Sequence, residues 1–433
     1  MPNYSNRMKK LLIIWVCCMA MVAHAQIRGN NIVVQVSPDR AHWTYRTGET
    51  ARLTATVLKS GCPIMQARVD YEAGPEMYPE VKKQGVTLAD GRMEWKATMR
   101  QPGFYRLKVT AHVDGKSYEG LCTVGFSPER LLPTTAYPDD FDSFWQNTLA
   151  QARHTALDPT RRLLPERCTE KVNVYEVSFQ NDRWGSRIYG VLCIPTKSGR
   201  YPALLRVPGA GVRPYAGDIW TAEQGCITLE IGVHGIPVTL PQTVYDNLAA
   251  GALSEYWAAN LDNRDKTPYK RIFTGAVRAI DYIATLPEWN GEQLGVAGSS
   301  QGGMLSLVCA ALDKRVTFIG VVHDAMCDHT ASLKGKACGW PHYFYGVNSP
   351  DPRKIKVSQY YDGVNFARRV TCKGWYSFGY NDEVVPPTSS YATYNVVSAP
   401  KELSIYPETG HFWVQEQWDE WQNWLLRQMN LKQ

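Results

Sequence analysis

One stretch restricts the fold of this 433-residue chain more than any other: Leu294-Gly295-Val296-Ala297-Gly298-Ser299-Ser300-Gln301-Gly302-Gly303-Met304. It starts as an apolar run typical of a buried strand and continues past Met304 as an apolar helical pattern. Between the two lies G-x-S-x-G, in which Gly298 and Gly302 flank Ser300. In this context the pattern predicts a sharp strand-to-helix turn that exposes the serine oxygen as a nucleophile. Ser299 is in the wrong register, because it lacks a glycine two residues before it.

The segments around this stretch alternate between strand and helix patterns. Helices are expected over 274–286 and 304–312, and Asp139-Asp140 is expected to cap a helix that begins at Phe141. An antiparallel hairpin is expected from 174–179 and 187–192. Continuous apolar runs, which suit strands covered on both faces of a mostly parallel sheet, occur at 203–207, 226–231, 294–297, 316–322 and 375–378. Together these patterns predict an α/β domain over residues 141–433.

A serine hydroxyl needs a neighbouring base to react at neutral pH. After a turn of this kind, an acidic residue and then a histidine follow the serine along the chain. His329, His342 and His411 leave room for that order. We favour His411, because it stands behind Gly410 on the loop that follows the last predicted strand, at 402–405.

The acid is expected on the loop after the strand predicted at 375–378, which places it at Asp382. Its carboxylate would accept a hydrogen bond from the imidazole and stabilise the imidazolium. Asp324, after the preceding predicted strand, is the alternative. We interpret Glu383 and Glu408 as solvated loop charges.

Attack on a carbonyl also requires backbone donors for the oxygen that becomes negative. One donor is expected to be the N–H of Gln301, the residue after the nucleophile. The other is expected from the glycine-containing loop 207–211, where we assign it to Ala210. A plain turn is the alternative interpretation of that loop.

The first part of the sequence predicts a different kind of domain. Residues 26–127 contain short alternating apolar and polar runs, among them 51–58 and 105–111, separated by turn signals such as Asp90-Gly91. About seven strands with this spacing indicate an immunoglobulin-like sandwich. It contains no cluster of catalytic residue types, so we favour a packing or positioning module over a carbohydrate-binding module. The Pro-rich residues 128–140 are expected to form a linker.

Residues 1–25 have the pattern of a secretory signal peptide. Arg7, Lys9 and Lys10 precede the apolar run 11–22, and Ala23-His24-Ala25 is an A-x-A cleavage site. The mature chain would begin at Gln26 and be exported to the periplasm or the outside of the cell. A membrane anchor is the alternative, as is a lipoprotein modified near Cys17-Cys18.

Charge and cysteine content exclude several function classes. The formal net charge is +6, and the three cations of the signal segment account for half of it. No block of Lys and Arg stands out, so neither nucleic acid nor a membrane surface is implied. Nine cysteines remain after cleavage, without C-x-x-C pairs, which argues against a structural zinc site. A disulfide between Cys62 and Cys122 is one possible pairing.

The α/β part of the sequence resembles the acetyl xylan esterase/cephalosporin-C deacetylase family of α/β-hydrolases. The resemblance begins near Tyr137 and rests on several blocks: Phe141-Asp142-Ser143-Phe144-Trp145; Tyr269-Lys270-Arg271-Ile272-Phe273 with Asp281; Gly298-Ser299-Ser300-Gln301-Gly302-Gly303; Gly379-Tyr380-Asn381-Asp382 with Pro386-Pro387-Thr388 and Tyr394-Asn395; and Tyr406-Pro407 with Gly410-His411. It implies an α/β-hydrolase fold and the catalytic residues Ser300, Asp382 and His411. It also implies oxyanion donors at Gln301 and Ala210.

The resemblance further implies hydrolysis of acetyl esters on plant polysaccharide or oligosaccharide, without a metal or organic cofactor. The family often forms hexamers, so a homo-oligomer is among the expected assemblies. Two departures are visible: Pro208-Gly209-Ala210 replaces the usual His-Gly-Tyr, and segment 324–350 is unlike that of typical members. Two other functions stay open as alternatives: a prolyl-oligopeptidase-type serine peptidase and a non-catalytic glycan-binding protein.

Overall fold

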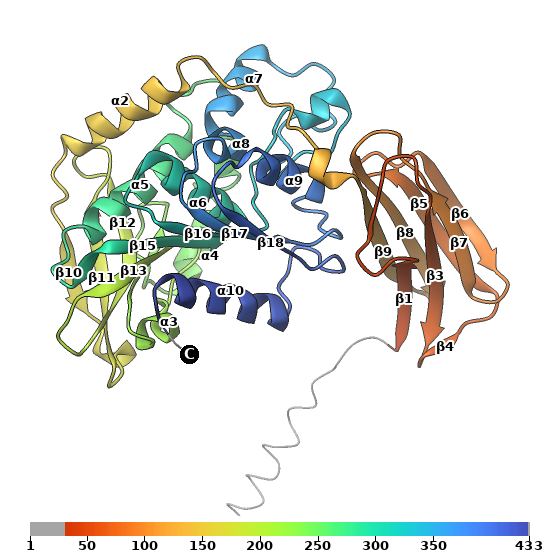
Figure 1. Ribbon diagram of the computed structural model, residues 1–433, viewed down its shortest axis with the longest axis horizontal. Coiled ribbons are helices and arrows are strands. Elements are labelled where there is room, and N and C mark those ends of the chain that lie inside the picture. The colour runs from red at the N-terminus through yellow and green to blue at the C-terminus, as the bar shows by residue number, and fades with distance from the viewer. Residues whose placement is uncertain (1–30, 432–433) are drawn as a thin grey trace, which may run out of the picture.

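The structure is a computed structural model that describes residues 31–431 (Figure 1). Two bodies are visible, which we call the β region (residues 31–126) and the α/β region (residues 141–431). The predicted signal peptide lies outside the described residues. Within the described part of the chain, no helix is both long enough and apolar enough to cross a bilayer.

The β region contains two sheets that enclose one core. The first has the strands β1 (Ile32–Pro38), β3 (Ala51–Lys59), β4 (Cys62–Pro63) and β7 (Arg92–Ala97). The second has the order β2 (Thr44–Tyr45), β9 (Lys116–Phe126), β8 (Gly103–Val113), β5 (Ala67–Pro75) and β6 (Val81–Leu88). Alternate residues of β3 and β8, such as Leu53 and Leu107, are fully buried between the sheets. The predicted strands are present, and the immunoglobulin-like assignment stays a prediction.

The disulfide considered for this region is not formed. Both thiols are free: Cys62 is exposed on β4, and Cys122 is buried in β9. Burial raises the pKa of the Cys122 thiol well above its usual value, which makes it an inert core residue.

The α/β region is built on a nine-stranded sheet. Its order is β10 (Thr160–Leu163), β11 (Val172–Gln180), β12 (Arg187–Pro195), β14 (Ile227–Gly232), β13 (Tyr201–Arg206), β15 (Trp289–Ser299), β16 (Phe318–Val322), β17 (Lys373–Phe378) and β18 (Lys401–Ile405). Pairing is antiparallel from β10 to β14 and parallel from β14 to β18. The predicted hairpin is therefore β11–β12, and the five apolar runs form β13 to β17.

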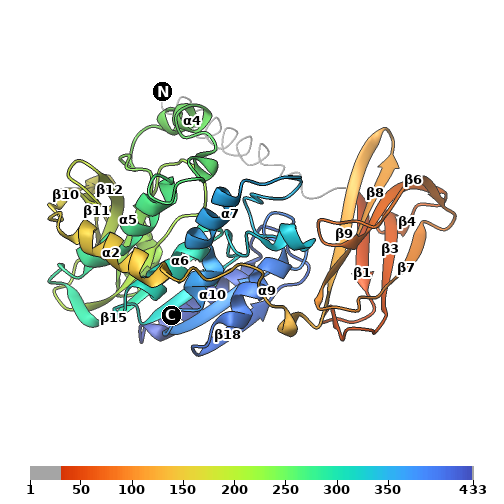
Figure 2. The same ribbon diagram turned by 90° about the horizontal axis from the view of Figure 1, so that it is seen from above.

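Helices cover both faces of this sheet (Figures 1 and 2). They are α2 (Phe141–Arg153), α3 (Ile219–Glu223), α4 (Gln242–Ala250), α5 (Pro268–Ile283), α6 (Gln301–Leu312), α7 (Pro352–Ser358), α8 (Gly363–Ala367), α9 (Pro387–Val396) and α10 (Gln415–Gln428). Successive residues of β15 face opposite sides: Val296 packs in the core beneath α5 and α6, and Ala297 packs with Trp421 of α10. Both faces are thus dry, as the continuous apolar runs require.

One local prediction was wrong. Asp140 occupies the N-cap position of α2, but its side chain makes no capping hydrogen bond. Its carboxylate instead accepts hydrogen bonds from Arg264 and Tyr360. A guanidinium and a phenol are stronger competitors for this carboxylate than a backbone N–H at the helix start.

Candidate active site

The turn between β15 and α6 holds Ser300 in a strained backbone conformation. Its φ is 61° and its ψ is −125°, values that a residue with a Cβ rarely adopts. A Cβ added to Gly298 or Gly302 would collide with the carbonyl oxygen of Val207 on the neighbouring loop. The two glycines therefore let strand, helix and loop meet closely, as the sequence predicted.

The structure brings Ser300, His411 and Asp382 together in one hydrogen-bonded chain. Ser300 Oγ lies 3.1 Å from His411 Nε2, and His411 Nδ1 lies 2.8 Å from Asp382 Oδ2. The three side chains come from the loops that follow β15, β18 and β17, at the carboxyl edge of the parallel strands. This geometry lets the imidazole take a proton from the serine while the carboxylate holds the ring.

Asp382 is fully buried and is nevertheless kept ionised. Burial alone would raise the pKa of the carboxyl. The two neighbouring imidazoles, His323 and His411, lower it by more than burial raises it, so the pKa falls well below the usual range. Its second oxygen, Oδ1, accepts hydrogen bonds from the backbone N–H groups of Val384 and Val385 at 2.9 and 2.8 Å. The carboxylate is thus fixed in place as an anion.

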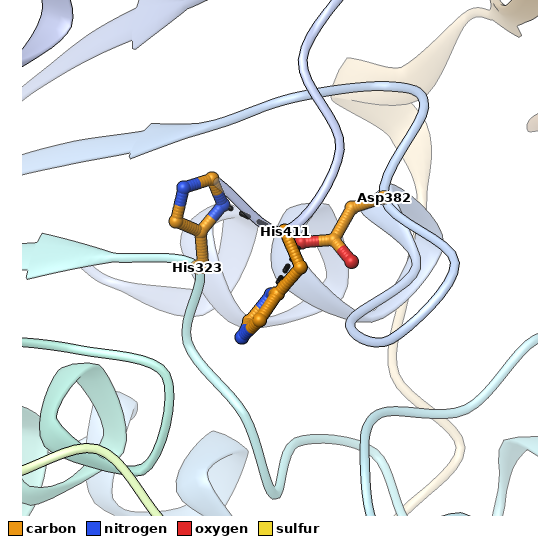
Figure 3. Close-up of side chains that lie close together, drawn as sticks. All are labelled: His323, Asp382 and His411. Atoms are coloured by element: carbon orange, nitrogen blue, oxygen red, sulfur yellow. Dashed lines mark hydrogen bonds and ion pairs between the residues drawn. The ribbon is translucent and has the colours of Figure 1, made fainter. Parts of the chain in front are cut away.

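A second histidine faces the same carboxylate (Figure 3). His323 follows β16 with a φ of 48°, and its Nδ1 lies 3.4 Å from Asp382 Oδ2. The ring is buried, and neither of its nitrogens has a hydrogen-bond partner of full geometry. The imidazole is therefore held at ion-pair distance from Asp382 without a full hydrogen bond, although a buried polar group that lacks one costs stability.

The loop predicted to supply a backbone donor lies next to the nucleophile. A Cβ added to Gly209 would lie 3.3 Å from the Ser299 oxygen and 3.8 Å from Ser300 Cβ. Ala210 lines the same cavity as Ser300. Gln301 opens α6, so its N–H has no partner in an earlier helical turn. Both N–H groups are therefore near the serine, and their role as donors stays a prediction.

The cavity in front of Ser300 has a volume of about 590 Å³ and mixed walls. The rings of Trp257 and Trp340, which both line the cavity, lie 5.2 Å apart. Arg213 also lines the cavity, and it donates a hydrogen bond to the carbonyl of Ala210 in the same segment between β13 and α3. The lining consists of Gly209, Ala210, Gly211, Arg213, Trp257, Ser299, Ser300, Trp340, Val384, His411 and Trp413.

The alternative sequence candidates lie elsewhere. Asp324 is buried, its carboxylate accepts from the Cys327 thiol, and burial raises its pKa to about 7. His329 is buried against Asp362 at 3.7 Å. Glu383 is half-exposed and lies 3.6 Å from both Arg106 and Lys108, so it pairs across the two regions rather than standing free in solvent.

The loop that carries Asp382 also contacts the β region. We call residues 379–386, between β17 and α9, the acid loop. Arg106 of β8 donates to the carbonyl oxygen of Asp382 at 3.0 Å, and Thr123 N of β9 donates to Asn381 Oδ1 at 2.9 Å. These contacts could not be predicted from the sequence, because nothing in a strand pattern identifies which residue meets a distant loop.

Sequence reasoning also missed His323, Arg213 and the two cavity tryptophans. His323 is adjacent to the rejected candidate Asp324 at the end of a predicted parallel strand, so its position at the carboxyl edge of the sheet was the available signal. Trp340 lies in segment 324–350, which was singled out as unusual. The structure shows that this segment lines the cavity through Trp340 and contacts the β region through Tyr345, whose hydroxyl donates to the Met77 carbonyl at 2.7 Å.

Comparison with known proteins gives concordant results. The family described as acetyl xylan esterase (AXE1) matches residues 129–428. The acetyl esterase Axe7A of Xylanibacter ruminicola is 38% identical over 439 residues, which cover 99% of this chain and 99% of that protein. The similarity to Axe7A therefore includes the β region.

Two solved structures resemble the α/β region. The acetyl xylan esterase from Paenibacillus sp. R4 has a TM-score of 0.60 and 23% identity, and it covers 69% of this chain and 98% of its own. Acetyl xylan esterase 1 from Thermoanaerobacterium sp. JW/SL YS485 has a TM-score of 0.59 and 24% identity, with 70% and 97% covered. These likenesses confirm the predicted α/β-hydrolase fold.

Proposed function

The chain belongs to the acetyl xylan esterase family, and from this premise we propose that it removes acetyl groups from plant polysaccharide or oligosaccharide by a Ser-His-Asp mechanism. It is a serine ester hydrolase. The observation that carries the mechanism is the hydrogen-bonded chain from Ser300 through His411 to Asp382, with steps of 3.1 and 2.8 Å.

The reaction proceeds in two steps. Ser300 Oγ attacks the acetyl carbonyl while His411 Nε2 takes the serine proton. The N–H groups of Gln301 and Ala210 hold the oxygen that becomes negative. The bond between the acetyl carbonyl carbon and the sugar oxygen then breaks, and the sugar leaves as an alcohol that carries the proton from His411. Water, deprotonated by His411, releases acetate and restores the serine.

The cavity supports a sugar ester as the substrate. Trp257 and Trp340 line the same cavity as Ser300 and offer flat apolar surface, and the Arg213 guanidinium and the backbone of 209–211 supply polar groups. Such a mixture suits a sugar, which has apolar faces and a polar rim.

We also propose that the chain is exported, which would bring it to polymers that do not cross membranes. N-terminal sequencing of the secreted protein should then begin at Gln26.

The test is Ser300→Ala, with Ser299→Ala as the matched control. Loss of the nucleophile is expected to reduce acetate release by about 10⁶, whereas Ser299→Ala should retain most of the activity. Acetate release by Ser300→Ala within tenfold of the parent protein would contradict the mechanism.

A second experiment tests the substrate class. Acetylated xylan, acetylated pectin, feruloylated sugars and short-chain esters should be compared with peptide substrates. Cleavage of peptides without a preference for esters would favour the peptidase alternative.

A further inference from the structure

We propose that the β region supports catalysis by positioning the acid loop, and that Arg106 is the positioning residue that holds this loop in its catalytic conformation. The inference rests on the proposed function, because it assigns a role in the same reaction. It is carried by contacts from β8 and β9 to the consecutive residues 380–382 of the acid loop, and from Glu76, just after β5, to Thr388 at the start of α9.

The first contact is made by Arg106, whose side chain is only 11% exposed. Its Nη2 donates to the backbone oxygens of Asp382 at 3.0 Å and Tyr380 at 3.4 Å. Its Nε donates to Thr123 Oγ1 of the neighbouring strand at 2.7 Å, which fixes the guanidinium plane. A charged donor to a carbonyl makes a stronger bond than a neutral one. The guanidinium therefore holds the main chain of the acid residue itself.

The second contact is made by Asn381, the residue just before the acid. Its Oδ1 accepts from Thr123 N at 2.9 Å, and its Nδ2 donates to the Leu121 oxygen at 3.2 Å. Its backbone N–H donates to the Thr409 oxygen at 3.1 Å, and its Nδ2 also lies 3.3 Å from the Glu408 oxygen. Asn381 thus joins β9 to the acid loop and to the loop that carries His411.

The third contact is made by apolar packing and one buried carboxyl. The ring of Phe104 lies 4.9 Å from that of Tyr380 and 5.6 Å from that of Tyr391. Glu76, fully buried, accepts from the hydroxyl of Thr388 at the start of α9 and lies 3.4 Å from Arg106 Nη2. Both flanks of the acid loop are therefore fixed to the β region.

These contacts matter because loops are the least rigid parts of a fold, and catalytic geometry tolerates little error. A misplacement of about 1 Å can cost about 10² in rate. The loop that carries His411 gives partial support, since Gly379 lies against Thr409. The second sheet of the β region adds further contacts through β8 and β9.

Two simpler roles predict different measurements. A purely structural interface would change thermal stability and leave kcat unchanged in the folded protein. A carbohydrate-binding module would change KM for polymer and leave a small ester unaffected. A positioning role changes kcat for every acetyl ester, including one too small to reach the β region.

The experiment compares full-length Arg106→Met and Arg106→Lys with Arg52→Met as control. Arg52 is exposed on β3, in the sheet that does not contact the acid loop. With a small soluble acetyl ester at saturation, Arg106→Met is expected to lower kcat by about tenfold to a hundredfold and change KM by less than about threefold. Arg106→Lys, which keeps a charged donor, should recover part of the loss, and Arg52→Met should match the parent protein.

Arg106→Met leaves the Glu76 carboxyl without its cation, so the variant Arg106→Met/Glu76→Gln is measured if the single change prevents folding. A folded variant, single or double, with kcat within twofold of the parent would overturn the proposal, as would a loss confined to polymeric substrate. Failure of the proposed function is recognised separately, because Ser300→Ala would then remain active. If Ser300→Ala is inactive and Arg106→Met is fully active, only the positioning role fails.

Discussion

The α/β region and the β region contribute to the active site in opposite ways. The α/β region supplies the triad and the described residues that line the cavity. The β region supplies none of these, yet it forms hydrogen bonds with the main chain of Asp382 and the side chain of Asn381. Reacting groups and the groups that hold them can thus come from two regions with separate sheets. A similarity restricted to the α/β region, as in the solved structures above, captures only the first kind.

The largest loss of activity is expected from a substitution in the triad, which the α/β region supplies. Asp382→Asn keeps the size of the side chain but removes the charge that stabilises the imidazolium, so kcat should fall by about 10⁴. Asp324→Asn is the matched control, because Asp324 is also buried and follows the neighbouring strand but does not contact His411. If the two variants lost similar activity in steady-state assays, the assignment of the acid would be wrong.

The next effect tests whether the β region is needed as a folded body. Leu107→Ala removes a fully buried side chain beside Arg106 and should lower the free energy of unfolding by about 2–5 kcal/mol. Val33→Ala, at an exposed position of the same region, should change it by less than about 0.5 kcal/mol. Thermal denaturation followed alongside residual activity checks this. If activity survived above the melting temperature of the β region, a folded β region would not be required for catalysis.

A smaller effect is expected for support of the acid from within the α/β region. His323→Phe removes the second imidazole beside Asp382 and should lower kcat/KM by about tenfold at neutral pH. The reason is that the ring, 3.4 Å from Asp382 Oδ2, helps to hold the carboxylate in place. His323→Asn, which keeps a polar side chain at this position, should lose less activity than His323→Phe in steady-state assays. An unchanged kcat/KM for His323→Phe would make that ring a packing residue only.

The smallest effect concerns pH and the interface. Burial raises the pKa of Glu76 from 4.5 to about 7, and the Arg106 charge only partly opposes this. A carboxyl with a raised pKa in the folded state contributes stability below its unfolded pKa and loses it as pH rises through the folded value. Glu76→Gln should therefore match the parent protein near pH 4.5 and become more stable than it by on the order of 1 kcal/mol above pH 7. Urea denaturation at pH 5 and pH 8 measures this, and an equal difference at both values would exclude the linkage.

Much of the α/β region could be predicted because its signals are local. The serine turn is encoded within a few residues by Gly298 and Gly302, and the apolar runs identify strands that are covered on both faces. His411 and Asp382 followed from the order of loops along the chain. The catalytic roles themselves stay predictions until the variants above are measured.

The rest could not be predicted because it depends on which distant segments meet. Arg106 belongs to an alternating strand in which any outward residue looks solvent-exposed. His323 meets Asp382 only because β16 and β17 pair in parallel with a particular register. Asp140 does not cap α2, because its carboxylate accepts a hydrogen bond from Arg264, which is distant in the sequence.

The placement of Arg106 and His411 has a consequence for biosynthesis. Arg106 is made early and His411 late, and the loop of Asp382 is held between elements from both parts of the chain. A nascent or proteolytically shortened chain that ends between these two residues lacks the base even when its serine turn has folded. Hydrolytic capacity should therefore arise only after translation has passed the last parallel strand, β18, and reached His411.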